Sequence, residues 1–274
     1  MSHAYVSART RALAAVLMAA FSLAGCGGDS SADLLGPDGK RAPGNLPSVG
    51  DFRAALVAAT GETGGNAPNG GLGFNMWGTI VDRAGVVQMV VFTGDSPVDQ
   101  WPGSRVISAQ KANTANAFSL TGFALSTANL YSAVQPGGSL FGLQESNPVD
   151  PTIAYDGKIE DFGTTKDPLI GQRIGGVNVF GGGLALYNSD EELIGALGVS
   201  GDTSCADHII AWKVRDALGL DYVPAGVDDG TDNIIHDIAA DGTSPSGFGH
   251  PECGATSTST ANNLPTTHPI GANE

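Results

Sequence analysis

The chain has little positive charge and few cysteines. Its 274 residues include 13 Lys and Arg against 28 Asp and Glu, which gives a formal net charge of −15 at pH 7. Because nucleic acids and anionic membrane surfaces attract basic proteins, this balance argues against both as partners. The sequence also lacks a P-loop, a nucleophile elbow, a zinc-protease motif and a Cys-Xaa-Xaa-Cys-His motif. The enzyme classes that these motifs mark therefore have no support.

The first 25 residues have the three parts of a secretory signal. Arg9 and Arg11 supply the positive charge, residues 12–21 form an apolar run, and small residues follow. The run is too short for a membrane-spanning helix, which needs about 20 apolar residues. It ends in Leu-Ala-Gly-Cys at residues 23–26, which resembles the lipobox of bacterial lipoproteins. We expect cleavage after residue 25 and a lipid on Cys26; the alternative is an ordinary signal peptide with an incidental cysteine.

The segment after Cys26 has the composition of a tether. Residues 26–48 are rich in Gly, Ser, Asp and Pro and hold little apolar material to fold around. Loss of residues 1–25 removes two positive charges, so the mature formal charge is −15 − 2 = −17. We expect a protein anchored to the cell envelope through its lipid, on the periplasmic or the outer-surface side.

The other two cysteines, Cys205 and Cys253, predict a disulfide. An exported chain meets oxidising conditions, and a bond between this pair would fasten the segment 221–254 to the core. Two free thiols are the alternative. Residues 255–274 are rich in Ser, Thr, Asn and Pro and are predicted to be disordered.

Hydrophobic periodicity between these ends predicts an α+β domain with one antiparallel sheet and helices packed against it. The order is a helix, a β-hairpin, one or two helices, further strands and a last helix, with an irregular insertion at 136–168. The expected helices are 51–59, 105–118, 126–134 and 205–218, and the expected strands are 77–81, 86–92, 177–180, 184–187 and 193–199.

Four motifs, in order, resemble the signatures of the GlcG/HbpS-like proteins. They are residues 80–85 (Ile-Val-Asp-Arg-Ala-Gly), 109–115 (Ala-Gln-Lys-Ala-Asn-Thr-Ala), 180–183 (Phe-Gly-Gly-Gly) and 194–201 (Ile-Gly-Ala-Leu-Gly-Val-Ser-Gly). The resemblance covers a domain at 49–220, with the insertion outside it. It implies a profilin-like α-β-α layered fold, assembly into homo-oligomers, and heme or a related tetrapyrrole as ligand.

The resemblance and the residue chemistry together predict a heme site. Lys111 could pair with a propionate, with Thr114 on the same helix face. Glycine permits close approach of a planar ligand, and His208 could be the axial ligand of the heme iron. Each of these residues also has an ordinary structural explanation: Lys111 could be solvated, the glycines could form a tight strand connection, and His208 could cap its helix. His236 and His250 of the extension could cover the site. The predicted cofactor-binding residues are Lys111, Thr114, Phe180, Gly181, Gly182, Gly183 and His208.

Three functions follow from this hypothesis. The first is a lipid-anchored, extracytoplasmic heme-binding protein for sensing, storage or delivery. The second is an enzyme that acts on a small organic acid or aromatic compound, with Lys111 orienting a carboxylate. The third is an assembly subunit that forms an oligomer without a ligand.

Overall fold

The computed structural model describes residues 45–61 and 68–271. The signal segment, Cys26 and most of the tether lie outside these residues, so their assignments stay predictions. The α-helices are α1 (Val49–Thr60), α2 (Gly103–Phe118), α3 (Leu143–Ser146), α4 (Pro151–Ala154), α5 (Ser204–Ala217) and α6 (Ala255–Thr267); the 3₁₀ turns are η2 (Ala128–Leu130), η3 (Ser132–Val134) and η4 (Ile159–Asp161); the strands are β1 (Trp77–Asp82), β2 (Val87–Phe92), β3 (Gly183–Tyr187) and β4 (Leu193–Ser200).

The four strands form one antiparallel sheet in the order β2-β1-β4-β3. A tight turn joins β1 to β2, where Gly85 has a φ of 76° and donates its N–H to the carbonyl of Asp82 at 2.9 Å. Glycine adopts such positive φ values without steric cost. The predicted hairpin is therefore confirmed, as is the single antiparallel sheet.

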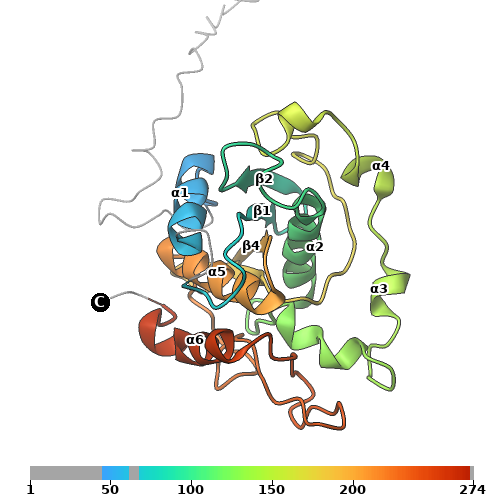
Figure 1. Ribbon diagram of the computed structural model, residues 1–274, viewed down its shortest axis with the longest axis vertical. Helices are drawn as coiled ribbons and strands as arrows, with labels where there is room; N and C mark the ends of the chain where they lie inside the picture. The colour runs from blue at the N-terminus through green and yellow to red at the C-terminus, as the bar shows by residue number, and fades with distance from the viewer. Residues whose placement is uncertain (1–44, 62–67, 272–274) are drawn as a thin grey trace, which may run out of the picture.

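Helices cover both faces of the sheet. Side chains alternate along a strand, so Ile80 of β1 packs with α1 and α5, whereas Trp77 and Val81 face α2. Thr79 also points to the α2 face, where its hydroxyl lies 2.7 Å from that of Ser108. Figure 1 shows α1 and α5 on one side of the strands and α2 on the other. The predicted α-β-α layering is confirmed.

Two predicted elements are wrong. Residues 126–134 form the two short 3₁₀ turns η2 and η3 rather than one helix, and residues 177–180 are a loop rather than a strand. In this loop the N–H of Asn178 donates to the hydroxyl of Thr114 at 3.0 Å, and the N–H of Phe180 donates to the side chain of Asn178 at 3.1 Å. Side chains thus satisfy backbone groups that a strand would pair with a neighbour.

Residues 255–267 of the tail, for which disorder was predicted, form the helix α6. Ser257, Ala261 and Leu264 are three and four residues apart, and all three are buried. Ala261 and Leu264 join the apolar cluster of α5, and the indole N–H of Trp212 donates to the carbonyl of His268 at 2.9 Å. In Figure 1, α6 lies beside α5, at the end of the long extension. None of the helices within the described residues is long and apolar enough to cross a membrane.

Candidate functional site

Lys111 forms a buried ion pair with Asp207 in the first turn of α5. Its ammonium nitrogen lies 2.6 Å from Asp207 Oδ2 and 3.0 Å from the carbonyl oxygen of Val199, and the side chain is 1% exposed. Burial lowers the pKa of Lys111 and raises the pKa of Asp207 to about 6, while the attraction between the two charges opposes both shifts. Both contacts hold the ammonium group inside the protein.

The glycine loop lies beside this pair, but it packs against protein. A Cβ atom on Gly181 would lie 2.3 Å from the carbonyl oxygen of Ser204, and one on Gly182 would lie 2.4 Å from that of Val199. A Cβ on Gly183 would lie 2.5 Å from the backbone oxygen of Lys111. The three glycines therefore let the backbone approach α2 and α5 closely.

Thr114 and Phe180 do not share a ligand surface. Thr114 is fully buried and accepts the N–H of Asn178, as described above, while its own hydroxyl donates to the carbonyl of Gln110 at 2.8 Å. Phe180 is 48% exposed. The structure thus brings the lysine and the glycines together, and their observed contacts are with other protein groups. Their predicted role in binding a cofactor stays a prediction.

His208 is likewise enclosed, although it lies on a rigid helix as predicted. It is fully buried on α5, and its Nε2 lies 3.2 Å from both the N–H nitrogen of Ile234 and the Oδ1 of Asn233. Burial lowers its pKa to about 3, so the ring is neutral at pH 7. An iron atom could reach this nitrogen only if the extension moved away, so the assignment of His208 as axial ligand does not fit this structure.

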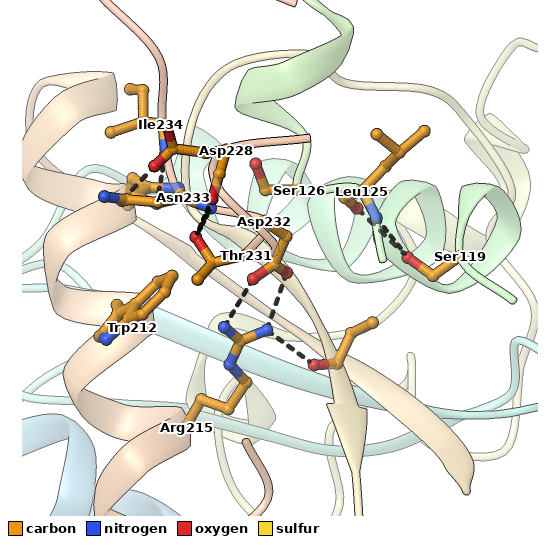
Figure 2. Close-up of polar contacts among 12 residues, drawn as sticks. Ser119, Leu125, Ser126, Trp212, Arg215, Asp228, Thr231, Asp232, Asn233 and Ile234 are labelled. Carbon is orange, nitrogen blue, oxygen red and sulfur yellow. Dashed lines mark hydrogen bonds and ion pairs between the residues drawn. The ribbon is translucent and has the colours of Figure 1, made fainter. Parts of the chain in front are cut away.

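A second buried ion pair holds the extension to α5. Arg215 donates to both carboxylate oxygens of Asp232, at 2.7 and 2.8 Å, and to the carbonyl of Ala185 at 3.1 Å. Figure 2 shows Arg215 reaching from its helix toward Asp232, with Trp212 on the same helix. Bidentate pairs of this kind are among the strong hydrogen bonds of proteins, so Arg215 holds the extension to α5 at Asp232.

Asp221 lies near this pair without a good partner of its own. Burial raises its pKa to about 7, and the positive charge of Arg215 opposes that shift. Both of its carboxyl oxygens are buried, and among the described residues neither accepts a hydrogen bond of good geometry. A carboxyl group in this position is stabilised by keeping its proton.

His236 and His250 gather next to the disulfide. The predicted Cys205–Cys253 bond is present, with an S–S distance of 2.03 Å. His250 is buried, and burial lowers its pKa to about 4. Both histidines line a hollow of about 310 Å³, together with Ile238, Pro251 and Glu252. Of the histidines in the described chain, these two therefore combine proximity to each other with access to a cavity.

Asp207 and Asp232, as partners of Lys111 and Arg215, and the proximity of His236 to His250 were not predicted from the sequence. One local signal was present for Lys111, because Ala109, Ala112 and Ala115 flank it and are fully buried. Small residues on both sides of a lysine indicate that its helix packs closely. No local signal pairs His236 with His250, because the fold of the extension alone brings them together.

The comparisons with known proteins agree with the sequence resemblance. The family model described as "Haem degrading protein HbpS-like" matches residues 69–215, so the chain belongs to the HbpS-like family. The crystal structure of the Klebsiella pneumoniae protein ORFY is 26% identical, with 63% of this chain and 90% of that chain covered and a TM-score of 0.40. The crystal structure of a PduOC:heme complex is 24% identical, with 63% and 92% covered and a TM-score of 0.42. No curated protein matches the chain significantly.

Proposed function

We propose that this protein binds heme or a related tetrapyrrole outside the cytoplasm, where a lipid on Cys26 anchors it to the cell envelope. Membership of the HbpS-like family supports the ligand class. The observation in this chain that carries the proposal is the pair His236 and His250 beside an open hollow.

His236 is the better candidate for the axial ligand. Its Nδ1 lies 3.3 Å from the carbonyl oxygen of His250, which places the ring proton there and leaves a lone pair on Nε2. This Nε2 is buried and has no hydrogen-bond partner among the described residues. Imidazole is a common axial ligand of heme iron. His236 also lines the hollow, so its Nε2 is the nitrogen that would bind the iron.

The size of the hollow sets how a tetrapyrrole would lie. A volume of about 310 Å³ is at the lower end of the range of ligand pockets, which is roughly 300–1,000 Å³. A hollow of this size would hold only part of a macrocycle, and Ile238 and Pro251 would supply apolar contacts to that part. This arrangement suits storage or delivery, in which the ligand has to leave again, better than catalysis. The enzyme hypothesis also loses its main residue, because Lys111 is not free to orient a carboxylate.

Heme titration tests the ligand. The mature, oxidised protein is titrated with hemin at micromolar concentration and the Soret band is followed. We expect a shifted band that His236→Ala weakens and that His268→Ala, a histidine remote from the hollow, leaves unchanged. An unperturbed spectrum for the wild-type protein, or equal spectra for wild type and His236→Ala, would refute heme binding at this site.

Mass spectrometry tests the anchor separately. We expect the N-terminal peptide of the protein from membranes to begin at Cys26 and to carry fatty acyl chains, and Cys26→Ala to be unacylated. The disulfide is consistent with an oxidising compartment outside the cytoplasm. An N-terminal peptide that still contains residues 1–25, or that begins at Cys26 without a lipid, would refute the anchor. Homo-oligomer formation is part of the same proposal and is read from the mass of the native particle.

A further inference from the structure

Three potential metal ligands converge where the extension meets the start of α5. One ring nitrogen each from His236 and His250 and the Sγ of Cys205 lie within 4.8 Å of one another. Cys205 is fully buried in the first turn of α5, and the two histidines come from the extension. The sulfur has no part in the heme proposal, so its position next to both imidazoles calls for a separate explanation.

The hydrogen bonds of the two histidines leave a lone pair on the Nε2 of each ring, which is the atom that would bind a metal. His250 Nδ1 lies 2.8 Å from the carbonyl oxygen of Pro251, as His236 Nδ1 faces the carbonyl of His250. A carbonyl only accepts, so each ring carries its proton on Nδ1 and a lone pair on Nε2. The Nε2 of His250 faces the hydroxyl of Ser204 at 2.9 Å. A carbonyl behind each ring is the usual support of a histidine that ligates a metal.

The sulfur is the group that changes with redox state. In the disulfide, Cys205 has no thiolate to offer. A thiol reductant supplies two electrons and two protons, which break the S–S bond and give two thiols, while the reductant becomes a disulfide. The Cys205 N–H already lies 3.2 Å from Cys253 Sγ at the N-terminus of α5.

We propose that reduction of the Cys205–Cys253 bond creates a zinc site, with His236, His250 and Cys205 as ligands and Cys253 in the fourth position. Zn²⁺ favours four tetrahedral N and S ligands at about 2.0–2.3 Å. The cation displaces the protons of the two thiols as it binds. In the disulfide-bonded structure the ligand atoms of His236, His250 and Cys205 already lie within 4.8 Å of one another, and Cys253 is bonded to Cys205. The oxidised protein lacks the thiolates and holds zinc weakly. This inference stands without the heme proposal, although both use His236.

Cobalt is the probe for this site, because Co²⁺ occupies zinc sites and absorbs visible light. The mature protein is reduced with a phosphine, freed of heme and titrated with Co²⁺ under anaerobic conditions. We expect one equivalent to bind, with a thiolate-to-metal charge-transfer band, and Zn²⁺ to displace it. The oxidised protein should give no charge-transfer band. Since the heme test uses the oxidised protein, failure of one test leaves the other unaffected.

Variants separate the ligands from the fold. His236→Ala and His250→Ala should each weaken Co²⁺ binding at least tenfold, whereas His268→Ala should bind as the wild type does. Cys253→Ser frees Cys205 without a reductant and should show the charge-transfer band in untreated protein. If that variant does not fold, the reduced wild type decides the question. The proposal is overturned if reduced protein binds Co²⁺ without thiolate absorption, or if both histidine variants bind with wild-type affinity.

Discussion

The ion pair between Lys111 and Asp207 links α2 to α5, two helices that pack on opposite faces of the sheet. The lysine side chain runs beside the glycine loop at the start of β3, since a Cβ on Gly182 would lie 3.2 Å from Lys111 Nζ. Asp207 in turn accepts the N–H of Asp202 at 2.9 Å, in the turn after β4. Three of the four family-like motifs thus meet at one buried contact, which explains their residue types by packing.

Removing one partner of this pair should be costly. We expect Lys111→Met to lower the free energy of unfolding by about 3–5 kcal/mol, because it leaves Asp207 buried without a cation. The double variant Lys111→Met with Asp207→Asn should recover part of the loss, since it buries no lone charge. Denaturant unfolding at pH 7 measures both. Lys158→Met, at an exposed position, is the control and should change stability by less than about 0.5 kcal/mol. A loss of under about 1 kcal/mol for Lys111→Met would contradict this account.

Gly198 in β4 is predicted to be the least replaceable small residue under α2. A Cβ there would lie 1.9 Å from the carbonyl oxygen of Ser108 and 2.6 Å from the backbone nitrogen of Ala112. We expect Gly198→Ala to lower the free energy of unfolding by at least about 1–3 kcal/mol, because helix and strand must separate. Gly103→Ala is the matched control, since a Cβ there meets nothing within 4 Å. Thermal unfolding compares the two, and equal midpoints would show that α2 does not lie this close to β4.

Much of the fold could be predicted from sequence because its signals are local. The hairpin of β1 and β2 follows from two apolar runs around a turn that ends in Gly85, and α5 follows from its amphipathic pattern. The helix α6 was not predicted, because its buried apolar side chains are only Ala261 and Leu264 and most of its other residues are polar. It is stabilised by contact with α5, which no local pattern reveals.

The site was harder to predict, because its residues are polar and their environment is set by distant segments. Lys111 and His208 have the right chemistry for heme, but burial and their partners Asp207 and Asn233 commit them to the interior. The disulfide is the exception. Only two cysteines remain after Cys26, so counting sufficed to predict the pair.

Asp221 should make stability depend on pH. Its folded-state pKa of about 7 lies above its ordinary value of 3.8, chiefly because of burial. Between these values the folded protein holds a proton that the unfolded chain has released. The contribution of Asp221 to the free energy of unfolding is therefore complete below about pH 4 and is lost as the pH rises through about 7.

Asp221→Asn removes this titration. We expect the variant to gain about 1–3 kcal/mol relative to the wild type between pH 5 and pH 8, measured by denaturant unfolding at both values. His208 acts in the opposite sense. Its folded-state pKa of about 3 lies below its ordinary value of 6.5, so its contribution is present above pH 6.5 and is lost on acidification. The contribution of His208 is the same in the wild type and in Asp221→Asn, so it cancels when the two proteins are compared. A constant difference between the two proteins across this range would refute the raised pKa of Asp221.

Loss of the disulfide should loosen the extension and α6 before it unfolds the sheet. The bond joins residues 48 apart in sequence, a loop for which the chain-entropy model gives about 4 kcal/mol. We expect Cys205→Ala with Cys253→Ala to lower the free energy of unfolding by about 2–4 kcal/mol. The pair Arg215–Asp232 still holds the first part of the extension, so the region after Asp232 should be the first to open. Limited proteolysis with mass analysis checks this order: cleavage between residues 237 and 254 should speed up in the variant and in reduced wild type, while the segment 77–217 stays intact. Equal cleavage rates with and without the bond would mean that Leu264 and its neighbours alone hold α6 in place.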